Sequence, residues 1–208
     1  MRSYDDKASE TAKRTSQKAH INFGSGSLSG TFMTDDIRLG SCDSKHGSIH
    51  ISQMKFGDVE KQKTIFTGTN FEAIVGLAYP ALAEPGVVPL FDSMMKQDLL
   101  KSNIFAFYFT SKQAEDLGLK SDLTFGYYDK TKYEGSVTWH PVLYKFMYGV
   151  QLDDIVINGK RMNLCKSKKC LITFDSGTSL MSVPVWAHEK LVAKKIPTAN
   201  YVQPCKSH

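Results

Sequence analysis

The order of apolar and polar residues along the chain predicts a protein built mainly from β-strands. Residues 21–37 alternate between apolar and polar side chains around a glycine-rich centre, which is typical of a β-hairpin with a glycine tip. The Asn158-Gly159 pair, which follows the apolar run 155–157, predicts a second hairpin with a two-residue turn. Further strands are expected in five short apolar runs: residues 48–51, 64–67, 105–109, 123–125 and 150–152.

Two helices are predicted where a proline precedes apolar residues at helical spacing. Pro89 opens a segment in which apolar residues recur at three- and four-residue intervals. Pro184 stands in the same way before residues 185–192. Residues 1–20 are polar and charged, so we expect a tail without regular structure there. The fold class is therefore mainly β, with two or three helices.

The composition is that of a globular protein. Hydrophobic residues make up 41% of the 208 residues and charged residues 23%, so disorder is not expected. No apolar run is long enough to cross a bilayer, and residues 1–20 lack the apolar core of a signal peptide. The chain therefore gives no sign of a membrane span.

The basic residues of the chain concentrate towards its C-terminal end. The net charge is +5, and residues 160–208 contain nine Lys and Arg residues against only Asp175 and Glu189. These cations are scattered, and no aromatic platform or recognition motif accompanies them. We therefore interpret them as a solvated surface and expect no nucleic-acid partner.

One stretch, Leu171 to Leu180, carries the candidate chemistry. An apolar run leads to Asp175, and Ser176-Gly177-Thr178 follows at once. This pattern predicts a strand that delivers a carboxylate into a tight turn, where hydroxyl groups can bind the carboxylate or the turn backbone. The same four residues are also ordinary turn chemistry, so the motif alone does not decide between an acid in an active site and a surface turn.

Four further stretches, in a fixed order, resemble those of the pepsin-like aspartic proteases. In that family the stretch around Asp175 is the second active-site signature. The other four are similar to the flap hairpin, the apolar-apolar-Gly segment of the first lobe, the crossing between the lobes, and a small disulfide loop before the acid: residues 21–30, 71–80, 133–142 and 165–170. The resemblance runs from about Tyr4 to Cys205 and implies a bilobal, mainly β fold.

The resemblance also implies that this fold is incomplete at both ends. An aspartic protease needs two carboxylates that face one water molecule, and no other Asp of the chain has the context of Asp175. The first lobe's Asp loop is expected before Met1, and the second lobe's apolar-Gly segment after His208. Residues 1–137 then form a partial N-terminal lobe and residues 138–208 a partial C-terminal lobe.

The resemblance assigns roles to single residues. Asp175 is expected to be one member of the catalytic dyad, supported by Ser176, Gly177 and Thr178. The residues expected to contact the substrate are Phe23, Gly24, Ser25, Gly177 and Ser179. Phe23 departs from the family, which usually has tyrosine here, and we expect weakened rather than abolished function from this change. Cys165 and Cys170 are expected to form a disulfide around a basic loop, whereas the partners of Cys42 and Cys205 are left open.

The expected function is an aspartic-type endopeptidase that acts on peptide or protein substrates at acidic pH without a metal or another cofactor. A zinc site is disfavoured because no His or second Cys pair has the required spacing. The expected location is a lysosome, a vacuole or the outside of the cell, and the full-length protein is expected to be monomeric. A peptide-binding pseudoprotease on the same scaffold, without catalysis, is the alternative, and a homodimer that assembles one Asp from each chain is less favoured.

Overall fold

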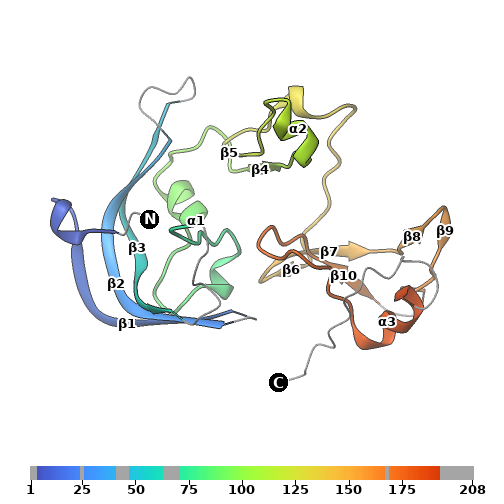
Figure 1. The fold of residues 1–208 in the computed structure, drawn as a ribbon, viewed down its shortest axis with the longest axis horizontal. Coiled ribbons are helices and arrows are strands. Elements are labelled where there is room, and N and C mark those ends of the chain that lie inside the picture. Colours follow the sequence, from blue (N-terminus) through green and yellow to red (C-terminus); the bar gives the residue numbers. More distant parts are fainter. Residues whose placement is uncertain (1–3, 24–25, 41–46, 63–70, 167–168, 193–208) are drawn as a thin grey trace. The chain divides into compact units, whose positions relative to one another are not determined.

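The chain divides into two compact units, Met1–Val137 and Thr138–His208 (Figure 1). The computed structural model describes residues 4–23, 26–40, 47–62, 71–166 and 169–192. Within these residues strands predominate and three α-helices occur, which confirms the predicted mainly β class. None of the described helices is long and apolar enough to span a membrane.

The first unit is built on a three-stranded antiparallel sheet with the order β1-β2-β3 (Figure 1). Its strands are β1 (Lys13–Phe23), β2 (Gly26–Leu39) and β3 (Ile49–Gln62). Phe23 pairs with Gly26, so β1 and β2 form the predicted hairpin around residues 24 and 25. The expected strand at residues 64–67 lies outside the described residues.

The expectation of an unstructured tail over residues 1–20 is wrong. A short 3-10 helix, η1, covers Asp6–Ala8, and β1 begins at Lys13. The sequence pattern does not predict β1, because only Ala19 is buried among its first seven residues and no apolar alternation marks the strand. Its backbone hydrogen bonds to β2 hold it instead, and the Thr15 hydroxyl donates to the carbonyl of Phe32 at 2.7 Å.

A hydrophobic core joins β3 to helix α1 (Leu90–Lys96). Met94 is fully buried against Ile51, so the apolar spacing after Pro89 marks the side of the helix that packs on the sheet. Phe91 makes an edge-to-face contact with Phe105, with ring centroids 4.9 Å apart. Phe105 opens β4 (Phe105–Tyr108), which pairs with β5 (Asp122–Phe125). The smaller elements of this unit are η3 (Pro80–Leu82), α2 (Lys112–Asp116) and η4 (Lys130–Lys132).

The second unit contains a small antiparallel sheet with the order β10-β7-β6. The strands are β6 (Tyr144–Lys145), β7 (Tyr148–Leu152) and β10 (Cys170–Ile172). The predicted Asn-Gly hairpin is confirmed by β8 (Val156–Ile157) and β9 (Lys160–Arg161). Asn158 and Gly159 both have positive φ angles, of 50° and 74°, as a two-residue turn of this type requires.

Helix α3 (Val185–Val192) closes the described part of the second unit. Ala187 and Leu191, one turn apart, are buried with Leu164 in a small core. The helix begins directly after Pro184, where the sequence predicts its start.

Candidate active site

Asp175 lies in a tight turn shortly after the last strand of the second unit. Strand β10 runs antiparallel to β7, with Ile172 opposite Val150, and Asp175 follows three residues later. The backbone N–H of Thr178 donates to the carbonyl oxygen of Asp175 at 3.2 Å, which closes the turn over Ser176 and Gly177. The predicted arrangement of strand, acid and turn is therefore present.

Two donors hold the carboxylate of Asp175 within its own turn. The backbone N–H of Gly177 donates to Oδ1 at 2.9 Å, and the Thr178 hydroxyl donates to Oδ2 at 2.5 Å. A Cβ atom on Gly177 would lie 3.2 Å from Oδ1, closer than most such contacts, so glycine permits this approach. Within the described residues, the Ser176 side chain makes no hydrogen bond to Asp175. The turn thus fixes both oxygens of an exposed carboxylate.

The apolar residues around this acid are exposed, which the sequence pattern does not predict. Strand β10 ends at Ile172, so the expected strand stops two residues earlier than the apolar run. Phe174 is 82% exposed, and Leu180 and Met181 are 73% and 71% exposed. None of the described elements of the second unit packs over these three side chains. The small hydrophobic core of this unit lies elsewhere, under α3.

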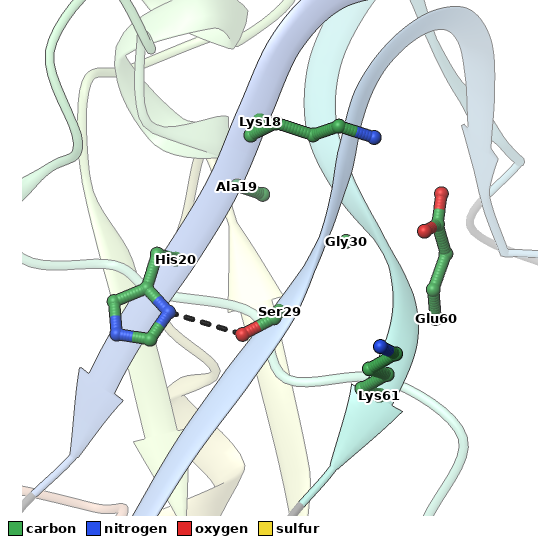
Figure 2. Close-up of a pocket in the computed structure, with 7 residues that line it drawn as sticks. All are labelled: Lys18, Ala19, His20, Ser29, Gly30, Glu60 and Lys61. Atoms are coloured by element: carbon green, nitrogen blue, oxygen red, sulfur yellow. Dashed lines mark hydrogen bonds between the residues drawn. The ribbon is translucent and has the colours of Figure 1, made fainter.

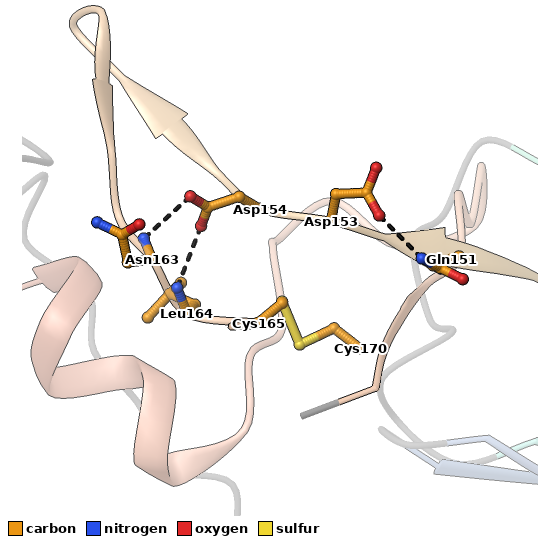
Figure 3. Close-up of a disulfide and its surroundings, with 7 residues drawn as sticks. All are labelled: Gln151, Asp153, Asp154, Asn163, Leu164, Cys165 and Cys170. Atoms are coloured by element: carbon orange, nitrogen blue, oxygen red, sulfur yellow. Dashed lines mark hydrogen bonds between the residues drawn. A yellow bond between two sulfur atoms is a disulfide. The ribbon is translucent and has the colours of Figure 1, made fainter. Parts of the chain in front are cut away.

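A disulfide joins Cys165 to Cys170 and so ties the start of β10 to the preceding loop (Figure 3). Asp154 lies beside this loop and accepts hydrogen bonds from the backbone N–H groups of Asn163 and Leu164, at 3.0 and 3.1 Å. Burial acts to raise the pKa of Asp154, but these backbone donors outweigh it and lower the pKa. The chain before Asp175 is therefore held by the disulfide and by the hydrogen bonds to Asp154.

Removing the disulfide is expected to destabilise the second unit. Replacing Cys165 and Cys170 by serine opens a loop of about five residues, for which chain entropy gives roughly 2 kcal/mol. We expect the urea midpoint of the double variant to fall by an amount that matches this loss, measured by circular dichroism under oxidising conditions. The unmodified chain with added reductant is the matched control, and an unchanged midpoint in both samples would contradict the expectation.

The residues predicted at the flap are only partly described. Phe23 ends β1, where its backbone pairs with Gly26, whereas Gly24 and Ser25 lie outside the described residues. The structure therefore places the hairpin but does not test the substrate contacts expected of these three residues.

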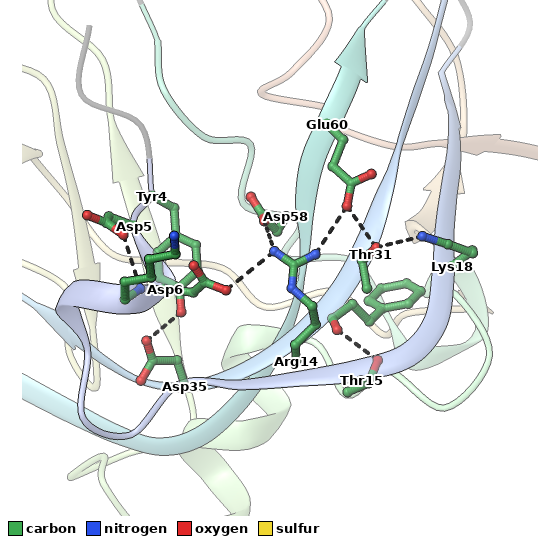
Figure 4. A network of polar contacts seen from close by, with 12 residues as sticks. Tyr4, Asp5, Asp6, Arg14, Thr15, Lys18, Thr31, Asp35, Asp58 and Glu60 are labelled. Carbon is green, nitrogen blue, oxygen red and sulfur yellow. Dashed lines mark hydrogen bonds and ion pairs between the residues drawn. The ribbon is translucent and has the colours of Figure 1, made fainter.

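A buried carboxylate that the sequence analysis does not identify lies near the base of this hairpin. Asp35 of β2 is only 4% exposed, and three hydroxyl groups donate to it: Tyr4 at 2.7 Å, Ser9 at 2.9 Å and Thr11 at 2.5 Å. Figure 4 shows the bond from Tyr4. The backbone N–H of Asp36 adds a fourth donor at 2.8 Å. Burial alone would raise the pKa of Asp35, but these bonds lower it to about 2.

The hydrogen bond to Asp35 also changes the pKa of Tyr4. Burial, together with the hydrogen bond and the negative charge of Asp35, raises the pKa of Tyr4 above its usual value. The Tyr4 ring also packs edge-to-face on Phe56 of β3, with centroids 5.1 Å apart. The polar sequence of residues 1–20 predicts only a tail without regular structure, so it does not indicate a buried acid held by Tyr4, Ser9 and Thr11.

Comparisons with known proteins bear on the identity of this chain. The family model described as eukaryotic aspartyl protease matches residues 1–207. Cathepsin D of Rattus norvegicus is 32% identical over 208 residues, which are 98% of this chain and 50% of that protein. Embryonic pepsinogen of Gallus gallus is 31% identical over 181 residues, 87% of this chain and 44% of that protein. Cathepsin E of Cavia porcellus is 34% identical over 176 residues, 85% of this chain and 42% of that protein.

These matches have two consequences. The chain spans about half the length of the curated relatives it matches. The match of the family model extends over nearly every residue and includes both the hairpin of β1 and β2 and the turn of Asp175. The chain belongs to the eukaryotic aspartyl protease family.

Proposed function

We propose that this chain is part of an aspartic-type endopeptidase in which Asp175 is one of two catalytic carboxylates. The observation that carries the proposal is the geometry of Asp175, an exposed carboxylate with both oxygens held by Gly177 and Thr178 of its own turn. The second carboxylate is supplied by polypeptide outside these 208 residues, since no other Asp of the chain stands in the same context. Residues 1–137 and 138–208 are the corresponding partial lobes.

The chemistry follows from placing two carboxylates against one water molecule. Two like charges in close contact cannot both be ionised cheaply, so the pair holds one proton at acidic pH. The ionised carboxylate takes a proton from water while the protonated one donates to the carbonyl oxygen of the scissile peptide bond. No metal or other cofactor takes part in this scheme.

The proposal extends to the environment and partners of the enzyme. Its substrates are peptides or proteins that bind against the flap at Phe23, Gly24 and Ser25 and against Gly177 and Ser179. The disulfide between Cys165 and Cys170 fits an oxidising compartment, so we place the protein in a lysosome or vacuole or outside the cell. The full-length enzyme is proposed to be monomeric.

A comparison of two polypeptides tests this function. The 208-residue chain alone is expected to show no cleavage of a fluorogenic peptide between pH 3 and 5, because it supplies one catalytic carboxylate. A polypeptide that adds an upstream Asp-Thr-Gly or Asp-Ser-Gly loop to the same chain is expected to cleave the peptide. Cleavage by the short chain would overturn the shared-dyad assignment, and inactivity of both, with retained peptide binding, would favour the pseudoprotease.

A further inference from the structure

A solvent-facing hollow of about 340 Å³ lies on the sheet of the first unit, over β1, β2 and β3 (Figure 2). Charges of both signs line it, because Glu60 contributes to its wall together with Lys18 and Lys61. The imidazole of His20 is already in contact with the Ser29 hydroxyl at 3.0 Å. The hollow therefore selects no class of ligand by its charge, whereas a chemically reactive pair of residues lies in the second unit.

The turn between β8 and β9 consists of Asn158 and Gly159 alone. Both residues are exposed, and both have positive φ angles, of 50° and 74°. Within the described residues, neither the carboxamide of Asn158 nor the backbone N–H of Gly159 makes a hydrogen bond. A Cβ atom on Gly159 would have no neighbour within 4 Å, so the turn stands clear of the rest of the unit.

Asn163 shows how differently a nearby asparagine is held. It also has a positive φ angle, of 53°, but the N–H of the residue that follows, Leu164, donates to the carboxylate of Asp154 at 3.1 Å (Figure 3). The Asn163 carboxamide donates to the carbonyl oxygen of Arg161 at 3.4 Å. At Asn163 the following backbone nitrogen is therefore engaged and carries a bulky residue, whereas at Asn158 it is free and belongs to glycine.

The hairpin that presents Asn158 is short enough to open. Strands β8 and β9 contribute two residues each, which pair as Val156 with Arg161 and Ile157 with Lys160. A two-stranded hairpin is marginally stable, and glycine, which has no Cβ, restricts backbone rotation least. The backbone nitrogen of Gly159 can therefore reach the side chain of Asn158 when the turn opens.

We propose that Asn158 is a site of spontaneous deamidation, independent of the protease function. The backbone nitrogen of Gly159 loses its proton to solvent and attacks Cγ of Asn158, which forms an N–Cγ bond. The Cγ–Nδ2 bond then breaks, and the amide nitrogen takes up a proton and leaves as ammonia, so that a five-membered succinimide remains. Water opens this ring at either carbonyl and leaves aspartate or isoaspartate at position 158, without any redox step.

The modification changes both the charge and the backbone of the hairpin. Either product replaces a neutral amide by a carboxylate next to Lys160 and Arg161. Isoaspartate also adds one methylene group to the main chain, and a two-residue turn does not accommodate this at an unchanged register. Because Ile157 packs against the small core around Leu164, isoaspartate is expected to loosen the hairpin from this core.

The test is a time course of the folded 208-residue chain at pH 8, followed by tryptic digestion and mass spectrometry with a zero-time reference. The peptide with Asn158 should gain the mass difference between an amide and a carboxyl group. Its rate is expected to lie within about tenfold of that of a free peptide with the sequence of residues 156–161. Asn163 should react at least about tenfold more slowly than Asn158, because the attacking nitrogen must first leave Asp154.

Two outcomes would overturn the proposal. If the folded chain reacted more than about tenfold more slowly than the free peptide, the turn would protect Asn158. If Asn163 reacted as fast as Asn158, the free N–H of Gly159 would not be the deciding feature. The Asn158→Gln variant should show no mass gain in this peptide, and circular dichroism verifies that it folds. The rate in the unmodified chain should fall at pH 5, because the attacking nitrogen must lose its proton, and an equal rate at pH 5 and pH 8 would contradict the mechanism.

Discussion

Replacing Asp175 by asparagine is expected to lower kcat/KM of the proposed full-length protease for a peptide substrate on the order of 10³-fold at pH 4. Asparagine fits the same turn, since its side-chain oxygen can still accept from Gly177 or Thr178. The amide cannot take a proton from water, nor can it share a proton with a second carboxylate. The loss should therefore fall on kcat, with little change in KM, and initial rates on a fluorogenic peptide measure both.

A matched variant shows whether the loss is specific to this carboxylate. Asp153 lies in the same unit, accepts one hydrogen bond from Gln151 at 2.9 Å and is exposed (Figure 3). The Asp153→Asn variant removes the same charge and should retain activity to within about twofold, since surface charges contribute little. If Asp175→Asn kept wild-type kcat while folded, Asp175 would not be a dyad member, and the pseudoprotease would become the better description.

The turn around Asp175 could be predicted from the sequence because its contacts are local. The acid, the glycine and the threonine stand within four residues, and their hydrogen bonds do not depend on the rest of the chain. The helix starts after Pro89 and Pro184 follow from equally local rules. The exposure of Phe174 could not be predicted, since burial depends on which distant elements pack against the strand.

Long-range polar contacts account for most of the structural features that the sequence pattern does not predict. Residues 13–20 were expected to be unstructured because their side chains are mostly polar, yet Lys13 is paired with Thr34, twenty-one positions away. The Asp35 cluster joins residues 4–11 to β2 across a sequence separation of 24 to 31 residues. Hydroxyl residues and a single Asp are common in exposed segments, so nothing in their order indicated this arrangement.

The second large effect is expected on stability. Replacing Asp35 by asparagine should lower the free energy of unfolding of the first unit by about 2–4 kcal/mol at pH 6, because hydrogen bonds to a charged acceptor contribute more than neutral ones. The asparagine side chain has one acceptor oxygen and cannot accept from all four donors of Asp35. Because position 35 is only 4% exposed, the hydroxyl groups that lose this acceptor cannot readily bind water instead. Urea denaturation followed by tyrosine fluorescence measures the change. The Asp116→Asn variant, on a side chain 64% exposed, is the control and should change stability by less than about 0.5 kcal/mol.

The pH dependence distinguishes a charged cluster from simple packing. The pKa of Asp35 is about 2 in the folded chain, below the usual 3.8, so its ionisation stabilises the fold above pH 3.8. This contribution, up to about 2 kcal/mol, is lost as the pH falls towards 2. The stability difference between wild type and Asp35→Asn should therefore be constant from pH 6 to pH 5 and shrink between pH 4 and pH 2. A difference that stays constant down to pH 2 would show that shape, not charge, holds residues 4–11 on β2. The proposed dyad works between pH 3 and 5, a range in which an ordinary carboxylate begins to lose its charge. Asp35 remains largely ionised in this range because its pKa is lower. Its hydrogen bonds therefore continue to hold residues 4–11 at the base of the hairpin.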